Sequence, residues 1–429
     1  MALLLAMPAL VAQGRPDDAD LAARIDALVR QEADARLLSG VILVARGDRV
    51  LFQRAYGRAN WELDVPNAPD TRFGVGSITK AMTQVVVDAL IDERRLDLDA
   101  PVSRYLGAFP QGPRGGVVTV RHLLDHRAGV PFRVTTELEE TLPLHPQEIV
   151  ERVRARGLLF EPGTQELYSS AGFSCLARVV EVIEGRAFDD VLRDRIFRPA
   201  SMTTATDETG QQLMPHRAMP YRLAATAGAL TVASARYKDL RFLTGAGSVY
   251  ATAEDLLHFV RAMQAGVLGR AARQRVAEGD SGSWRSWYGR TTGYETSVDV
   301  DPAQDLTFVF LSNLRSGANW QVREQVKRLL TGASAVAIRR PPPPADPFEA
   351  PGTFVGSYGD PSDPIVISVE DGHLFRDDSE FYPAAGGNYC LPASGFLMRF
   401  RRTGGTVDAL LTDRGTGTES VALRVTPRR

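Results

Sequence analysis

The sequence predicts an α+β domain, built on an antiparallel sheet flanked by helices with a mainly helical subdomain, followed by a small all-β domain. Three observations lead to this prediction. Strand-like runs stand at both ends of roughly the first 330 residues and enclose a helical middle. The stiff run Pro341 to Pro344 then indicates an interdomain linker. Beyond it, short strands alternate with Gly-rich turns, as in small barrels. The predicted divisions are residues 1–15 (signal remnant), 16–335 (α+β domain), 336–347 (Pro-rich linker) and 348–429 (β-barrel-like domain).

The elements follow from hydrophobic patterning. Two β-rich runs at 40–45 and 50–55 flank Arg46-Gly47-Asp48, and Gly-Asp favours a tight hairpin turn over an adhesion motif. Residues 77–91 are apolar on almost every side, the pattern of a helix buried in a domain centre. Further helices are expected at 120–125, 171–183, 252–263 and 319–330, and further strands at 294–300, 306–311, 365–369, 395–400 and 420–425. The helix at 252–263 begins with a capping box, Thr252 with Asp255.

Composition excludes several classes of protein. Lys plus Arg total 50 against 52 Asp plus Glu, and neither sign gathers into a long block, which argues against a nucleic-acid surface or an acidic tail. Two cysteines in different predicted domains exclude a disulfide framework. Outside the N-terminus, no stretch approaches the ~20 apolar residues of an integral membrane span. The expected partner is a small molecule.

The first dozen residues form an apolar run that ends in small residues. This resembles the core and cleavage region of a secretory signal, although the basic start is missing. The run predicts a periplasmic or secreted protein; the alternative is a cytoplasmic protein with a truncated or misassigned start. Nothing in the sequence indicates an oligomeric state.

Lysine is scarce in this chain. It occurs only at Lys80, Lys238 and Lys327, so 47 of the 50 basic residues are arginines. Genome composition accounts for such a bias. Arginine nevertheless keeps its proton at any useful pH, whereas lysine can lose it, so each retained lysine is a candidate for proton transfer.

Ser77 and Lys80 form a Ser-x-x-Lys pair at the start of the apolar helix. Side chains three residues apart share one helix face, so hydroxyl and amine can meet. The helix N-terminus favours the negative charge that builds on a carbonyl oxygen under attack. Lys80 can activate the serine only when neutral. Lowering a lysine pKa from ~10.4 to near 7 costs roughly 4–5.5 kcal/mol, which burial can supply. The spacing also arises by chance, so it needs support from other segments.

That support comes from several collinear segments. They are Phe73 to Lys80, Leu96 to Val102, Thr119 to Gly129, Glu161 to Thr164, Tyr168 to Ser170, Pro199 to Met202 and Ala246 to Tyr250. Together they closely resemble the serine β-lactamase-like family, which includes class C β-lactamases, penicillin-recognising D-Ala-D-Ala carboxypeptidases, D-aminopeptidases and family VIII esterases. The resemblance covers about residues 40–330. It implies a β-lactamase/transpeptidase-like fold and an acyl-enzyme formed on Ser77.

By this resemblance, Tyr168 fills the tyrosine of the family's second motif, Tyr-x-Asn. It would share with Lys80 the work of taking the serine proton and returning it to the leaving group. This chain has Ser170 where the motif has asparagine. A hydroxyl can hydrogen-bond, but it lacks the carbonyl and amine with which asparagine holds a substrate amide, which weakens the case for peptide-like substrates. Alternatively, Tyr168 is a core tyrosine.

The third family motif is Lys-Thr-Gly or His-x-Gly on a sheet strand. Counting back without gaps from Gly293-Tyr294 places Trp287-Tyr288-Gly289 there, similar to the Trp-x-Gly of family VIII esterases. By this resemblance, Gly289 lets the substrate lie against the strand, and the N–H groups of Arg290 and Ser77 form the oxyanion hole. The cation that attracts a β-lactam or peptide carboxylate is then missing, unless Arg290 replaces it. In the alternative, Trp287 is packed core.

Two competing signals are weaker. Gly279-Asp280-Ser281-Gly282-Ser283 imitates the trypsin-type nucleophile segment, but that family's disulfides cannot be made here, so a polar loop is expected. His122 and His126 stand four apart beside Asp125 and could bind zinc, but the Glu of a His-Glu-x-x-His motif is absent. We therefore predict no metal and no cofactor.

These features favour a serine hydrolase that acts on a small-molecule ester or amide, with carboxylester hydrolysis of small esters expected first. The alternatives are a D-amino-acid peptidase or D-Ala-D-Ala carboxypeptidase, and a β-lactamase. Departures in two of the three motifs also leave open a catalytically silent ligand-binding relative.

Overall fold

The computed structural model describes residues 18–208, 213–226, 229–277, 284–345, 349–359, 365–370, 372–376, 379–392, 396–413 and 419–425. The predicted signal remnant at 1–15 and the trypsin-like segment at 279–283 lie outside the described residues.

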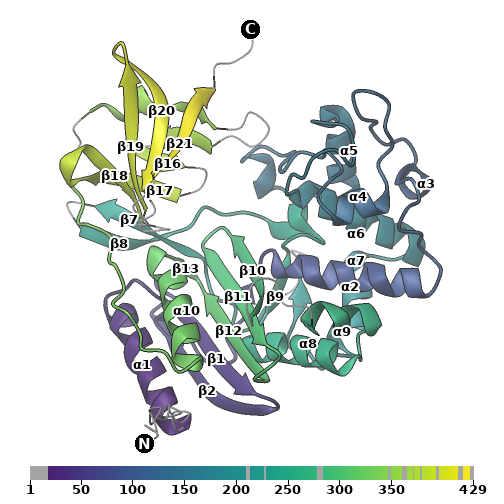
Figure 1. Cartoon of the computed structure of the whole chain (residues 1–429), viewed down its shortest axis with the longest axis horizontal. Coiled ribbons are helices and arrows are strands. Elements are labelled where there is room, and N and C mark those ends of the chain that lie inside the picture. Colours follow the sequence, from purple (N-terminus) through teal and green to yellow (C-terminus); the bar gives the residue numbers. More distant parts are fainter. Residues whose placement is uncertain are drawn as a thin grey trace, which may run out of the picture.

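A five-stranded antiparallel sheet in the order β10-β11-β12-β1-β2 forms the centre of the first domain (Figure 1). Its strands are β1 (Gly40–Arg46), β2 (Arg49–Tyr56), β10 (Arg285–Thr291), β11 (Tyr294–Asp301) and β12 (Leu306–Ser312). The central strands are buried along their length because helices cover both faces. The four strands predicted for this domain, including the hairpin around Gly47, are confirmed.

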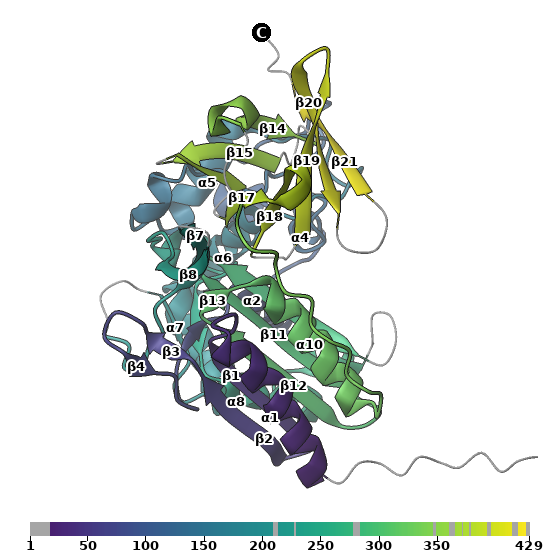
Figure 2. The ribbon, with the colours of Figure 1, turned by 90° about the vertical axis from the view of Figure 1, so that its left-hand side faces the viewer.

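Two helices, α1 (Asp18–Asp34) and α10 (Gly317–Leu330), lie across one face of the sheet (Figure 2). Ile25 and Val29 of α1 and Val326 of α10 pack in one apolar cluster with Ile42 and Phe308 of the sheet. The predicted helix at 319–330 is confirmed, whereas α1 was not predicted. The four-residue spacing of its buried Leu21, Ile25 and Val29 was the available signal.

The opposite face is covered by α2 (Ile78–Asp92) and α8 (Ala253–Ala265), and α9 (Arg270–Ala277) packs against these two helices. Helix α2 is buried on almost every side, as its sequence predicts, because it lies between the sheet and the helical lobe. The capping box of Thr252 and Asp255 is present at the start of α8. Among the helices in the described ranges, none is long and apolar enough to cross a membrane.

A helical lobe packs beyond α2 (Figure 1). Its helices are α3 (Ser103–Leu106), α4 (Val120–Leu124), α5 (Pro146–Arg156), α6 (Ser170–Glu184) and α7 (Phe188–Leu192). The region 94–265 was expected to hold mainly helix and loop, and it also holds strands that were not predicted. It contains β6 (Thr206–Asp207), β7 (Tyr221–Thr226), β8 (Ala229–Ser234) and β9 (Val249–Ala251). Most of these strands pair with partners distant in sequence, such as β5 (Phe73–Gly74) and β13 (Leu314–Arg315), so they leave little local pattern. The short strands β3 (Arg58–Asn60) and β4 (Val65–Pro66) pair with each other.

The C-terminal domain is a closed antiparallel barrel of eight strands. They are β14 (Gly356–Tyr358), β15 (Ile365–Glu370), β16 (His373–Arg376), β17 (Ser379–Ala384), β18 (Asn388–Leu391), β19 (Phe396–Thr403), β20 (Thr406–Asp413) and β21 (Glu419–Val425). Aromatic rings fill its interior, with Phe400 in ring contact with Phe354, Phe381 and Tyr389. The predicted all-β domain is confirmed, while its boundaries in sequence stay a prediction.

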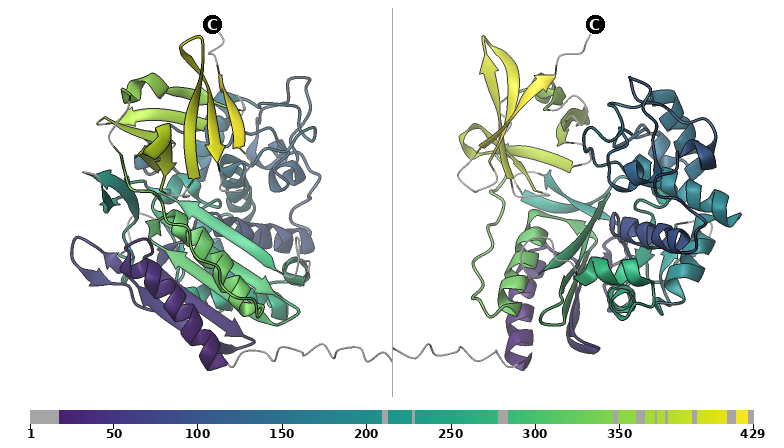
Figure 3. Two further views of the ribbon diagram at one scale, coloured as in Figure 1. Left: turned by 60° about the vertical axis from the view of Figure 1, so that its left-hand side comes forward. Right: turned by 45° about the vertical axis from the view of Figure 1, so that its right-hand side comes forward.

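The barrel sits on the β7–β8 hairpin of the first domain (Figure 3). Arg222 of β7 pairs with the buried Glu380, and the guanidinium groups of Arg222 and Arg236 lie 5.4 and 4.9 Å from the ring centroid of Phe375. The N–H of Gly317 also donates to Pro392 O at 2.6 Å. Ala225 and Leu230 of the hairpin also pack against the buried Tyr382 of the barrel, so polar, cation–π and apolar contacts hold the two domains together.

All three lysines are largely buried. Lys80 is 7% exposed, and the side chains of Lys238 and Lys327 are 7% and 14% exposed. Lys238 pairs with the fully buried Glu140 at 2.8 Å, and Lys327 pairs with the fully buried Asp299 at 2.7 Å. Asp299 also accepts hydrogen bonds from Ser297 and Arg323 between the sheet and α10.

We expect Asp299→Asn to lower the free energy of unfolding by about 3–5 kcal/mol, because it leaves Lys327 and Arg323 buried without their counter-charge. The measurement is chemical denaturation followed by tryptophan fluorescence, which reports only the first domain because all four tryptophans lie there. The control is Asp64→Asn, whose 80% exposed carboxylate pairs with Arg58 and should contribute less than about 1 kcal/mol. Equal losses from both variants would contradict this account.

Candidate active site

Ser77 lies where the chain turns from β5 into α2, and Gly76 makes that turn possible. Gly76 has φ 53°, and a Cβ added there would lie 2.7 Å from Arg290 N on the neighbouring strand β10. Glycine is needed both for the left-handed backbone and for this close approach. Ser77 itself is only partly buried, so a substrate can reach its hydroxyl.

Lys80 places its amine beside three oxygens. Its Nζ lies 3.2 Å from Ser77 Oγ, 3.3 Å from Ser170 Oγ and 2.8 Å from the carbonyl oxygen of Ala246. Within the described chain, none of these hydrogen-bond partners is a carboxylate. Burial lowers the pKa of Lys80 to about 7, so a large fraction of the amine is neutral near physiological pH.

Tyr168 completes the group around Ser77. Its hydroxyl donates to Ser77 Oγ at 2.8 Å, and the residue remains 44% exposed. Desolvation raises the pKa of Tyr168, against the opposing effects of the Ser77 hydrogen bond and the positive charge of Arg290. The phenol therefore stays protonated at neutral pH and can donate a proton to an oxygen near Ser77.

Ser170 is the first residue of α6, directly after Ser169, which caps that helix. Its hydroxyl oxygen accepts the hydrogen bond from Lys80, so it holds the amine from the side opposite to α2. Ser170 therefore offers one hydroxyl where the family motif has asparagine, and no amide group that could hydrogen-bond a substrate.

Strand β10 carries Trp287, Gly289 and Arg290 past Ser77. A Cβ added at Gly289 would lie 1.9 Å from Val75 O, so only glycine allows β10 to lie against the segment that leads into α2. The N–H group of Arg290 faces Gly76, next to Ser77. Trp287 is partly buried against the main core, with the Arg285 guanidinium 5.6 Å from its ring centroid.

The charge near the site comes from Arg290. Its side chain is exposed and has no ion-pair partner among the residues that the structure describes. The positive charge of Arg290 acts to lower the pKa of Tyr168, against the effect of desolvation. The structure thus brings Ser77, Lys80, Tyr168 and Ser170 into one hydrogen-bonded group, with β10 beside it.

Two groups that contact Lys80 or Tyr168 were not identified from the sequence. The Ala246 carbonyl takes the shortest hydrogen bond from Lys80, and a backbone oxygen leaves no residue-type signal. His126, weighed there only as a metal ligand, packs against Tyr168 with ring centroids 4.5 Å apart.

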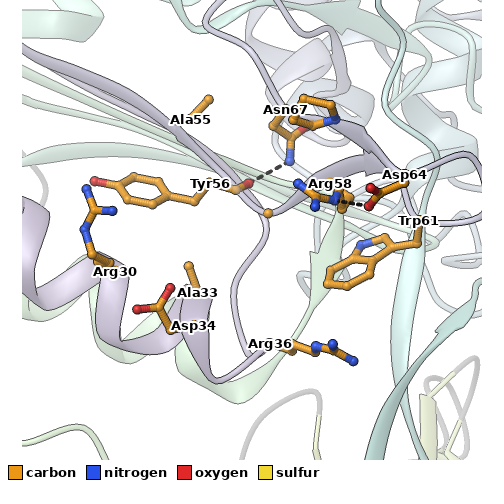
Figure 4. A pocket seen from close by; sticks show the side chains of 12 residues that line it. Arg30, Ala33, Asp34, Arg36, Ala55, Tyr56, Arg58, Trp61, Asp64 and Asn67 are labelled. Carbon is orange, nitrogen blue, oxygen red and sulfur yellow. Dashed lines mark hydrogen bonds and ion pairs between the residues drawn. The ribbon is translucent and has the colours of Figure 1, made fainter.

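A cavity of about 580 Å³ lies elsewhere, between the end of α1 and the β2–β3 segment (Figure 4). This is at the β2 edge of the sheet, whereas Ser77 lies near the β10 edge. Arg30, Arg36, Arg58, Trp61, Asp64 and Asn67 are among its lining residues. These described lining residues include no serine or cysteine nucleophile, so the cavity is separate from the group around Ser77.

Comparisons with known proteins identify the family. Residues 25–331 match the family model described as Beta-lactamase. The chain is 28% identical over 230 residues to the putative penicillin-binding protein PbpX of Bacillus subtilis (strain 168), covering 54% of this chain and 56% of that protein. It is 29% identical over 325 residues to esterase EstB of Burkholderia gladioli, and the alignment covers 67% of this chain and 82% of EstB.

The solved structure of SurE superposes on 95% of this chain, with all of the SurE chain matched, a TM-score of 0.63 and 20% identity. This likeness concerns the fold and includes the C-terminal domain. The alignment with PbpX spans little more than half of that protein. The family match covers most of the chain and agrees with the motifs in the sequence. The chain therefore belongs to the Beta-lactamase family and has the β-lactamase fold.

Proposed function

We propose that this protein is a carboxylesterase for small neutral esters, with Ser77 as nucleophile, Lys80 as proton acceptor and Tyr168 as the proton-transfer partner. The observation that carries the proposal is the buried amine of Lys80, which lies 3.2 Å from Ser77 Oγ and has a pKa of about 7. A neutral amine at this distance can take the serine proton as the oxygen attacks.

The reaction would run in two halves. Lys80 accepts the Ser77 proton while Oγ bonds to the ester carbonyl carbon, and the N–H groups of Ser77 and Arg290 stabilise the oxyanion. The tetrahedral intermediate expels the alcohol oxygen, which takes a proton from the Tyr168 hydroxyl, and Lys80 returns its proton to Tyr168. Water then attacks the acyl-enzyme by the same route and frees the acid and Ser77.

Three features favour neutral esters over amides or anions. Ser170 offers one hydroxyl in place of an amide, Trp287 stands where a cation is expected, and one relative of this chain is named an esterase. One observation favours a second candidate, hydrolysis of a carboxylate-bearing D-amino-acid peptide or amide. The guanidinium of Arg290 is exposed and acts on Tyr168, so it could attract a substrate carboxylate.

A serine-directed phosphonate should add once per chain, and Ser77→Ala should abolish this labelling, because Ser77 is the hydroxyl that contacts both Lys80 and Tyr168. Intact-protein mass spectrometry followed by peptide mapping measures it. Labelling that persists at Ser281 in the variant would contradict the assignment of Ser77.

Lys80→Arg should lower kcat as severely as Lys80→Ala, by about 1000-fold or more, because arginine keeps the charge but cannot accept a proton. In the unmodified enzyme, kcat/KM should fall as the pH drops below about 7, where the Lys80 amine becomes protonated. The measurement is a pH-rate profile with a neutral ester. Near-normal turnover by the arginine variant would exclude Lys80 as the base.

We expect neutral short-chain esters to be preferred over penicillins and D-Ala-D-Ala peptides by at least about 100-fold in kcat/KM, roughly 2.7 kcal/mol of discrimination in the transition state. The test is a panel of p-nitrophenyl esters, D-Ala peptides and a chromogenic cephalosporin. Trp287→Lys should narrow the gap by improving the anionic substrates.

Arg290→Gln tests the second candidate, because it removes the guanidinium charge and keeps the backbone N–H of the oxyanion hole. Loss of activity on D-Ala peptides alone would support the second candidate. A cephalosporin hydrolysed as fast as an ester by the unmodified protein would overturn the ester proposal. Acylation without turnover on every substrate would indicate a binding relative.

A further inference from the structure

His126 holds the backbone on both sides of Tyr168. It lies in the turn that follows α4, and its carbonyl oxygen accepts the N–H of Leu167 at 2.8 Å. Its ring Nδ1 accepts the N–H of Ser169 at 3.1 Å. The two amides that flank Tyr168 therefore donate to the same residue.

The His126 ring also packs on the Tyr168 ring. The ring centroids are 4.5 Å apart with an interplanar angle of 38°, and Phe173 lies 5.1 Å from the same imidazole. Lys80 Nζ lies 4.8 Å from the Tyr168 ring centroid. The phenol is thus confined between an imidazole that cannot move freely and the amine with which it would exchange a proton.

The chemistry requires a neutral imidazole. Nδ1 can accept from Ser169 only when it carries no proton, so the ring proton resides on Nε2. Burial, and then the charge of Lys80, lower the pKa of His126 to about 4. Lys80 from α2 and Tyr168 from the segment before α6 are the titratable groups that face this ring. The acceptor is therefore available throughout the pH range in which Lys80 titrates.

We propose that His126 is a positioning residue that holds the Tyr168 hydroxyl on Ser77 through its acceptor nitrogen and its ring face. This inference rests on the proposed function, because Tyr168 matters only if it transfers protons. The backbone of His126 has φ 56°, a region that histidine, asparagine and aspartate enter more readily than aliphatic residues do. An acceptor at this position and tolerance of that backbone are both needed.

Two variants test the acceptor and the backbone tolerance of this position together. His126→Asn tolerates the positive φ and offers Oδ1 close to the place of Nδ1, whereas His126→Leu fills the space without an acceptor. We expect the leucine variant to lose about 100-fold in kcat on a neutral ester with little change in KM, because a small displacement of a catalytic group costs about that much. The acidic limb of its pH profile should also move, since that limb belongs to the coupled Lys80 and Tyr168 pair. The asparagine variant should recover most of kcat and the original profile.

His122→Leu is the control. His122 lies four residues earlier, in α4, where its ring accepts the N–H of Thr119 at 3.3 Å. It contacts the cap of that helix and none of the group around Ser77, so its loss should lower thermal stability and leave kcat and the pH profile unchanged.

The outcomes are distinct. A leucine variant at 126 that keeps kcat and the pH profile overturns the inference, as does an asparagine variant no better than leucine. The rate at which a phosphonate reacts with Ser77 is measured in parallel, because it reports activation of the serine without any ester. If the unmodified protein hydrolyses esters and takes the label while the His126 variants behave normally, only this inference fails. If the unmodified protein does neither, the proposed function fails and this inference with it.

Discussion

The burial of Lys80 is the constraint on which the rest of this structure depends. Moving its pKa from 10.5 to about 7 disfavours the charged form by about 5 kcal/mol. The unfolded chain binds that proton more tightly than the folded one, so burying Lys80 lowers the free energy of unfolding. This cost is full below pH 7, shrinks between pH 7 and 10.5, and is absent above pH 10.5. The apolar packing of α2 on nearly every side both creates this cost and supplies the burial energy that offsets it.

Close backbone approach, more than side-chain identity, keeps the amine and the serine in place. Gly76 and Gly289 allow β10 to touch the chain just before α2, which sets the Arg290 N–H beside Ser77. The Ala246 carbonyl and Ser170 fix the amine from two other segments. Four stretches that are distant in sequence therefore meet around one hydroxyl, and each is held by the core of the first domain.

Sequence patterns predicted those parts of the fold that have a local signature. The hairpin around Gly47, the buried helix after Ser77 and the capped helix after Thr252 each depend on nearby residues, and all were located within a few positions. Strand β9 was missed because it pairs with β5 and β6, which are distant in sequence, whereas the β7–β8 hairpin is local and was missed all the same. At the site, the Ser-x-x-Lys spacing pointed to Ser77 and Lys80, and the resemblance to the serine β-lactamase-like family pointed to Tyr168. A backbone carbonyl and a stacked histidine acquire their roles only from three-dimensional contact.

The scarcity and burial of lysine also affect how the folded protein meets chemical reagents. Lys80 and the side chains of Lys238 and Lys327 are 7%, 7% and 14% exposed, while the accessible cations are arginines. Acylating reagents aimed at primary amines would find almost no lysine to modify until the core opens. The rate of lysine acylation would then follow the opening of the native state. Lys238 would report opening of the loop that holds Glu140, Lys327 opening at the α10 face of the sheet, and Lys80 opening of the site around Ser77.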